Sequence, residues 1–239
     1  MDTFISNSAY NVSLNGVLSD SYHLRAGVRQ GGVISPILFA VYIDTVIVTI
    51  QNLGLGCHVG MRSMSIFMYA DDLVLISGSV NDLQSMVDVC IGELKNLDLL
   101  INAKKSICIR IGKNFKTGCS VIYIDSFRLQ WSDKMVYLGI TILSSTRFSI
   151  DLKPSRSKFY RSFNALYCKI CKSDVFLIVS LFKSFCMPLV MFSLEAINLN
   201  ASCLNSIDSL TFNAFWKIFK TQDRNSLKSC MFFYELLAS

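Results

Sequence analysis

The sequence predicts an α+β fold in which a mixed first part is followed by a mostly helical second part. Two observations support this prediction. Up to about residue 150, short apolar or alternating runs typical of strands surround helices that have an apolar stripe. After Pro154 the apolar residues recur at helical spacing instead. We therefore predict two domains, residues 1–150 and residues 151–239.

The composition indicates a large buried core. Of the 239 residues, 52% are hydrophobic, and the mean hydropathy is +0.44. Two apolar stretches, residues 33–50 and 176–194, are about as long as a membrane-spanning helix. Each contains a proline, and Asp44 and Lys183 would be unfavourable in lipid. We expect buried helices and no membrane, with a membrane protein as an alternative.

Net charge and cysteine spacing further limit the possible classes of protein. A net charge of +6 is compatible with a nucleic-acid partner. Only Cys168 and Cys171 form a C-x-x-C pair, and His23 and His58 lie far from them in the sequence. We therefore predict reduced, mostly buried thiols in an intracellular protein. Residues 1–11 lack the basic and apolar regions of a signal peptide.

The first predicted elements are a hairpin and a helix. An alternating run leads to Asn15 and Gly16, a pair that predicts a tight hairpin turn. Residues 25–36 form a glycine-rich loop, after which an apolar helix is predicted over residues 37–53.

A second hairpin is predicted further along the chain. Two apolar runs, residues 64–69 and 73–76, are separated only by Ala70, Asp71 and Asp72, which predicts strand, turn, strand. We expect both arms to lie inside a sheet that is covered on both faces, so that the turn is held rigidly.

The remaining elements follow from periodicity. Apolar residues at three- and four-residue steps predict a helix over residues 83–97, and Asn81 with Gln84 has the form of a capping box. Further strands are predicted over residues 107–111, 121–129 and 135–142, and further helices over residues 155–171, 174–187 and 204–220.

Asp71 and Asp72 are a candidate pair of metal ligands. Two-metal phosphoryl transfer needs oxygen ligands on rigid elements, and Mg²⁺ prefers carboxylates. Aspartate is also a common turn residue, so this pattern alone leaves an ordinary turn open.

Four motifs resemble, in order, those of reverse transcriptases of the non-LTR (LINE-type) retrotransposon kind. Residues 69–77, YADDLVLIS, are similar to the catalytic box, and residues 27–36, GVRQGGVISP, resemble the box that precedes it. Residues 100–106 and 137–140 are similar to the two boxes that follow.

The resemblance implies an RNA-directed DNA polymerase that transfers nucleotides to a primer 3′ hydroxyl by a two-metal mechanism. Residues 1–150 would form a partial polymerase palm of the split βαβ, ferredoxin-like kind, with a carboxylate hairpin and a primer-grip-like hairpin. Residues 151–239 would form a thumb-like connection region. Two Mg²⁺ ions would be the cofactors. An RNA template, a DNA primer and deoxynucleoside triphosphates would be the partners, in the cytoplasm and nucleus.

The resemblance also implies residue roles. Asp71 and Asp72 would bind metal, and Lys105 would act near the leaving pyrophosphate. The residues implied to bind nucleotide or template are Arg29, Gln30, Gly31, Gly32 and Tyr69. The residues implied to bind primer are Tyr137, Leu138 and Gly139, and those implied to contact phosphates are Arg156, Lys158 and Arg161. Asp98 stands where the family usually has glycine, which alters the turn before Lys105.

One part of the family's site is expected to be missing. Its further metal-binding carboxylate lies well upstream of the glycine-rich box, and here that box begins at Gly27, preceded only by Asp2 and Asp20 as acids. We expect a fragment that starts after the first catalytic box. Without the N-terminal part of the same polyprotein it would be poorly soluble and inactive. The alternatives are a non-functional mobile-element remnant and a group II intron-type reverse transcriptase.

Overall fold

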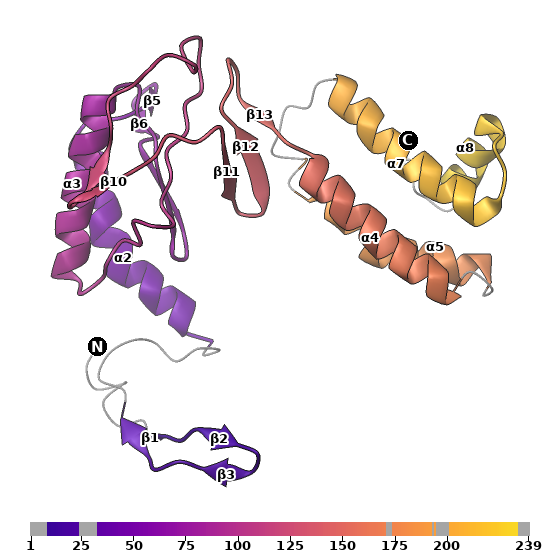
Figure 1. The fold of residues 1–239 in the computed structure, drawn as a ribbon, viewed down its shortest axis with the longest axis horizontal. Helices are drawn as coiled ribbons and strands as arrows, with labels where there is room; N and C mark the ends of the chain where they lie inside the picture. The colour runs from indigo at the N-terminus through magenta and orange to yellow at the C-terminus, as the bar shows by residue number, and fades with distance from the viewer. Residues whose placement is uncertain (1–8, 24–32, 171–173, 193, 195–200, 234–239) are drawn as a thin grey trace. The chain divides into compact units, whose positions relative to one another are not determined.

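The computed structural model describes residues 9–23, 33–170, 174–192, 194 and 201–233 (Figure 1). The chain forms two compact units, one from Met1–Cys108 and Lys116–Ser132, the other from Ile109–Phe115 and Asp133–Ser239. Each unit contains helices and strands, which confirms the α+β class.

The two units divide near residue 133, before the change of secondary structure near residue 150 that gave the predicted domains. The reason lies in backbone pairing: Gly112 donates to the carbonyl of Ser145, and Ser144 Oγ donates to the carbonyl of Arg110. These bonds tie residues 109–115 to the strands that follow residue 133. The assignment of a palm to residues 1–150 and a thumb to residues 151–239 stays a prediction.

The first hairpin is confirmed. Asn15 and Gly16 adopt φ angles of 51° and 82° and form the two-residue turn between β2 and β3. β1 and β4 continue the pairing below that turn. The four strands are β1 (Ala9–Tyr10), β2 (Ser13–Leu14), β3 (Val17–Leu18) and β4 (Tyr22–His23).

The predicted apolar helix is also confirmed as α2 (Ser35–Asn52), with Pro36 in its first turn, where a missing N–H is tolerated. Its buried residues Ile43, Val46 and Ile50 pack against α3 (Val80–Asn96) and β7 (Ile66–Tyr69). Among the described helices, α2 is the one that is long and apolar enough to cross a membrane, a test that core helices of soluble proteins also pass.

The centre of the first unit is α3 (Val80–Asn96), which has two apolar sides. Met86, Cys90 and Leu94 join the core of α2 and the second hairpin. Val87 and Ile91 instead pack against Ile122, Ile124 and Leu129, of which Ile124 belongs to β9 (Tyr123–Ile124). Figure 1 shows α3 beside α2. The hairpin strands between α2 and α3 are β5 (His58–Val59), β6 (Arg62–Ser63), β7 (Ile66–Tyr69) and β8 (Asp72–Leu75).

The predicted capping box of α3 is wrong. Ser79, with an extended backbone, is the N-cap residue, and its Oγ accepts a hydrogen bond of 3.4 Å from the backbone N–H of Asp82. Gln84 lies one turn inside the helix, where its side chain bonds to both backbone groups of Tyr123 at 2.8 and 3.0 Å. Gln84 therefore fixes β9 against α3.

Two predicted strands differ in the structure. Residues 107–111 form only isolated bridges, from Cys108 to Trp131 and from Ile111 to Ser145. Residues 121–129 form a hairpin because Asp125 adopts a φ of 50° and turns β9 (Tyr123–Ile124) into β10 (Phe127–Arg128). Aspartate tolerates this left-handed conformation, and the surrounding apolar residues obscured the turn.

The second unit begins with an antiparallel sheet in the order β11 (Lys134–Tyr137), β12 (Ile140–Leu143) and β13 (Ser149–Ile150). Five helices follow among the residues that the structure describes. They are α4 (Lys153–Ile170), α5 (Val175–Phe185), α6 (Met187–Met191), α7 (Ala201–Phe219) and α8 (Arg224–Phe233). The three predicted helices are confirmed as α4, α5 and α7.

The helical core is aromatic. Phe159, Phe182 and Phe215, from α4, α5 and α7, are fully buried and meet edge to face, with ring centroids 5.9 and 5.4 Å apart. α8 was not predicted from the sequence, although Asp223 marks its start. The Asp223 carboxylate accepts hydrogen bonds from the backbone N–H and the hydroxyl of Ser226, and these bonds lower the pKa of Asp223.

Asp98 ends α3 in the left-handed conformation, with a φ of 55°. Leu99 N–H donates to the carbonyl of Leu94, and Asp98 N–H donates to the carbonyl of Lys95. This is the Schellman arrangement, in which the position of Asp98 favours glycine because a Cβ is strained there.

We therefore expect Asp98→Gly to raise the free energy of unfolding by about 0.5–1 kcal/mol. Urea denaturation measures the change, with Asn96→Gly, inside the last turn of the same helix, as the control that should destabilise by about 0.3 kcal/mol. An Asp98→Gly variant that is less stable than the parent chain would contradict the strain argument.

Candidate active site

The carboxylate hairpin is confirmed, with a two-residue turn at Ala70 and Asp71. β7 and β8 pair antiparallel from Ile66–Leu75 to Tyr69–Asp72. Since side chains alternate along a strand, Ile66 and Met68 share one face with Leu73 and Leu75. These four residues pack on the core of α2 and α3 and form the inner face.

The expectation that both faces of the hairpin are covered is wrong. Phe67, Tyr69, Asp72 and Val74 form the outer face, on which Phe67 is 44% and Tyr69 65% exposed. Among the described residues, β7 and β8 pair only with each other. The hairpin is therefore supported from one side, and the Tyr69–Asp72 pair stands on the open side.

The turn presents two carboxylates to solvent. Ala70 has a φ of 52°, a strained conformation for a residue with a Cβ. Asp71 follows in the turn, Asp72 is the first residue of β8, and both are exposed. Neither side chain forms a hydrogen bond or ion pair with another described residue. Their oxygens are available to an external ligand.

These carboxylates fit part of a magnesium site. Adjacent carboxylates are suitable oxygen ligands for Mg²⁺, which keeps several waters and needs few protein groups. No third acidic, histidine or cysteine side chain gathers with them among the described residues.

Two cysteines of the first unit have raised pKa values. Burial raises the pKa of Cys90 to about 11. Burial, together with the nearby Cys119, raises the pKa of Cys108 to about 11, so both side chains stay protonated thiols at neutral pH.

Lys105 is exposed in a turn that Asn102 stabilises. The Asn102 side chain accepts from the backbone N–H of Lys105 at 3.3 Å, and the Asn102 carbonyl accepts from Ser106. This turn follows the Schellman end of α3 at Asp98. The role of Lys105 near a pyrophosphate stays a prediction.

Four predicted site residues, Arg29, Gln30, Gly31 and Gly32, lie outside the described residues. Of the nucleotide-binding set, Tyr69 is described: it pairs with Asp72 and is exposed beside it. The structure therefore brings together Tyr69, Asp71 and Asp72 from the predicted set.

The predicted hairpin at Tyr137, Leu138 and Gly139 is present in the second unit. Leu138 and Gly139 have φ angles of 47° and 81° and join β11 to β12. A Cβ at Gly139 would lie 3.6 Å from the ring of Phe192. Primer binding by these residues stays a prediction.

The predicted phosphate contacts are all exposed on α4. Residues two apart on an α-helix point about 200° apart around its axis. Lys158 and Arg161 therefore share a face, whereas Arg156 points to another.

Comparison with known proteins identifies the family. Residues 2–142, more than half of the chain, match the family described as reverse transcriptase (RNA-dependent DNA polymerase). The match includes the hairpin with Asp71 and Asp72.

Three relatives are polyproteins or polymerases of mobile elements. The Pol polyprotein of retrotransposable element R2DM from Drosophila melanogaster is 32% identical over 145 residues, covering 56% of this chain and 14% of the relative. The R2 polyprotein of Popillia japonica is 27% identical over 48% of this chain and 17% of its own length. The RNA-directed DNA polymerase from mobile element jockey of D. melanogaster is 24% identical over 86% and 23%.

The chain thus spans less than a quarter of the length of these relatives. Its four motifs keep the order found in the family, and the turn between β7 and β8 has the geometry that the catalytic box predicted. This chain belongs to the reverse transcriptase family, in its non-LTR (LINE-type) retrotransposon branch.

Proposed function

We propose that the chain supplies the carboxylate turn of an enzyme that copies an RNA template into DNA. The observation that carries the proposal is the position of Asp71 and Asp72, exposed and without a described partner, at the tip of a hairpin anchored on α2 and α3. This turn lies within the part of the chain that matches the reverse transcriptase family.

In this proposal Asp71 and Asp72 ligate Mg²⁺. Bound Mg²⁺ would neutralise the triphosphate of the incoming deoxynucleotide and lower the pKa of the primer 3′ hydroxyl. The hairpin contributes rigidity, because its inner face is fixed on the core while the turn stays open. Tyr69 offers an aromatic surface beside Asp72, suited to a nucleotide base or sugar.

The other predicted residues take the following proposed roles. Arg29, Gln30, Gly31 and Gly32 contact template or nucleotide, and Lys105 neutralises charge on the leaving pyrophosphate. Tyr137, Leu138 and Gly139 position the primer, and Arg156, Lys158 and Arg161 contact nucleic-acid phosphates, which adds affinity without sequence choice.

We further propose that the chain needs the preceding part of its polyprotein for activity. Two metals need more ligands than one turn provides, and the described residues gather no third one. The bare outer face of the hairpin, with Phe67 and Tyr69, would be covered by that part. We propose an intracellular location, because the scattered cysteines of the sequence do not have the spacing of a disulfide framework.

Primer extension tests the proposed function. The 239-residue chain and the polypeptide translated from the longest reading frame that contains it are each supplied with a primed RNA template, deoxynucleotides and Mg²⁺. We expect extension by the longer polypeptide and at most traces by the chain alone. Failure of a folded, template-binding longer polypeptide would reject DNA synthesis as the function and favour a mobile-element remnant. Efficient extension by the chain alone would reject the proposed dependence on the preceding part.

A further inference from the structure

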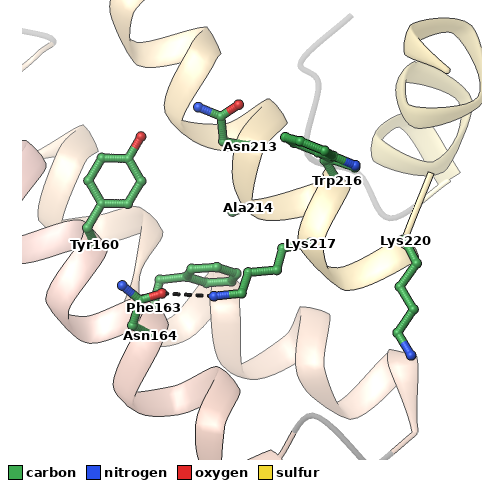
Figure 2. A pocket seen from close by; sticks show the side chains of 8 residues that line it. All are labelled: Tyr160, Phe163, Asn164, Asn213, Ala214, Trp216, Lys217 and Lys220. Carbon is green, nitrogen blue, oxygen red and sulfur yellow. Dashed lines mark hydrogen bonds between the residues drawn. The ribbon is translucent and has the colours of Figure 1, made fainter. Parts of the chain in front are cut away.

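A cavity of about 660 Å³ lies between α4 and α7 in the second unit (Figure 2). α4 contributes Tyr160 and Asn164, and α7 contributes Asn213, Trp216 and Lys217, with Lys220 just beyond its end. In Figure 2 the Tyr160 phenol, the Asn213 amide and the Trp216 indole surround this space, and Lys217 reaches across to Asn164. Trp216 is 45% exposed, although its size and ring would favour burial.

Lys217 is held in place at the wall of the cavity. Its Nζ donates to Asn164 Oδ1 at 3.2 Å and lies 5.0 Å from the ring centre of Tyr167. The Tyr167 hydroxyl in turn donates to the backbone carbonyl of Lys217 at 3.0 Å. An ammonium group has three donors, so Lys217 keeps donors for a ligand.

A second cavity, of about 320 Å³, shares Asn213 and Trp216 with the first. Its other polar lining residues include Ser209, Gln222 and Arg224, and the Arg224 guanidinium lies 5.3 Å from the ring centre of Phe212. Trp216 thus borders two adjacent cavities, each with its own cation. None of the described residues that line them is acidic.

This combination selects for a negatively charged ligand with planar groups. The cations favour an anion, the indole and phenol surfaces favour stacking, and the Asn213 amide can both donate to and accept from a base edge. Two cavities side by side suit a ligand that repeats these features along its length. A duplex hides its bases in its own stack, whereas a single strand presents them.

We propose that these cavities bind consecutive unpaired nucleotides of a single-stranded nucleic acid. One base stacks on Trp216 in the first cavity, with its phosphate near Lys217 and Lys220, and the next nucleotide lies near Arg224 in the second. The site deepens the proposed function, because it gives the helical unit a binding preference for single strands over duplex.

The signal was present in the sequence. Asn213, Trp216, Lys217 and Lys220 are spaced at i, i+3, i+4 and i+7 and so share one face of the predicted helix. The apolar periodicity that predicts the helix does not reveal this face, which carries one amide, one tryptophan and two lysines.

Tryptophan fluorescence tests the site. The chain has two tryptophans, Trp131 and Trp216, so in a Trp131→Phe background Trp216 is the sole reporter. The chain, fused to a tryptophan-free solubility partner, is titrated with a twelve-nucleotide RNA of mixed sequence and with the same RNA annealed to its complement. We expect the single strand to quench Trp216 and to bind at least about tenfold more tightly than the duplex.

Matched substitutions separate stacking from charge. In a labelled-RNA binding assay, Trp216→Ala should weaken single-strand binding about tenfold or more, and Trp216→Phe should retain most of it. Lys217→Gln should reduce the slope of log K against log salt by about 0.7. Lys169→Gln, an equal loss of charge on α4 that lines neither cavity, should leave the preference for single strands unchanged.

Equal affinity for single strand and duplex, or unaltered binding by a Trp216→Ala variant with native circular dichroism, would overturn the proposal. Quenching by inorganic phosphate as strong as quenching by RNA would also overturn it, in favour of a simple anion site. Because the assay contains no metal or nucleotides, its result is independent of DNA synthesis. Binding without synthesis would count against the proposed function alone, and synthesis without this binding would count against the cavities alone.

Discussion

Replacing Asp71 by asparagine is expected to lower DNA synthesis by the longer polypeptide at least about a hundredfold. Asparagine keeps the size of the side chain and one acceptor oxygen but removes the negative charge that, in the proposed function, would hold Mg²⁺. Asp71 and Asp72 are exposed, so the substitution should leave the fold intact. Asp72→Asn is expected to have a smaller effect, because Asp72 lies beside the turn and water can take the place of its oxygen as a ligand. Rates of single-nucleotide addition to a primed RNA measure both changes.

Asp125→Asn is the matched control. Asp125 occupies the turn between β9 and β10 with a φ of 50°, and its carboxylate is exposed, so the same atoms change in another hairpin of the same unit. It pairs with Lys95 at 2.7 Å, and exposed ion pairs contribute only about 0–1 kcal/mol. We expect less than about a twofold change in rate, because Asp125 is not part of the proposed metal site.

Metal binding can be measured without activity. Mn²⁺ is a paramagnetic stand-in for Mg²⁺, and we expect it to broaden the NMR signals of residues 69–73 in the parent chain. Asp71→Asn should largely abolish this broadening, and Asp125→Asn should preserve it. Equal broadening in Asp71→Asn, or an undiminished rate of synthesis, would refute the assignment of Asp71 as a metal ligand.

The hairpins show what local sequence could and could not predict. Two hairpins were predicted correctly, one from the turn-forming pair Asn15 and Gly16 and one from the paired acids at 71 and 72. In both cases the residues that predict the hairpin lie within the turn itself. The exposure of Phe67 and Tyr69 could not be predicted, because an apolar side chain has the same identity whether or not another segment covers it. Covering depends on tertiary partners, which periodicity does not reveal.

In the candidate site, too, some features could be predicted from the sequence and others could not. The order of the motifs predicted which residues share the carboxylate turn, and the structure brings Tyr69, Asp71 and Asp72 together there. Lys105 follows the end of α3 at Asp98, so the direction of the Lys105 side chain depends on how that helix ends. The sequence indicated this helix end only by an aspartate where the family usually has glycine. Arg156 and Lys158 lie two residues apart on the predicted helix, so the helix alone already implied that they point in different directions. Grouping them only as basic residues hid this difference.

The position of the carboxylate turn depends on a glycine at the other end of the hairpin. Gly56 has a φ of 86°, and a Cβ there would lie 2.5 Å from Ser65 Cβ and 2.7 Å from the backbone oxygen of Ile76. That oxygen accepts a hydrogen bond from Cys57 N–H, and Ile76 N–H donates to the Ser65 carbonyl. A side chain at position 56 would therefore push apart the base of the hairpin, where it meets α3 at Met86.

We expect Gly56→Ala to lower the free energy of unfolding by about 3 kcal/mol or more, from left-handed strain and overpacking together. Gly54→Ala isolates the first contribution, since Gly54 has a φ of 66° but nothing within 4 Å of the added Cβ, and should cost about 1 kcal/mol. Urea denaturation of the two variants measures the difference, and equal losses would mean that the loop moves aside without strain. Because the core between α2, α3 and the inner face of the hairpin orients Asp71, the clash at Gly56 should also weaken Mn²⁺ binding at a distance, whereas Gly54→Ala should not.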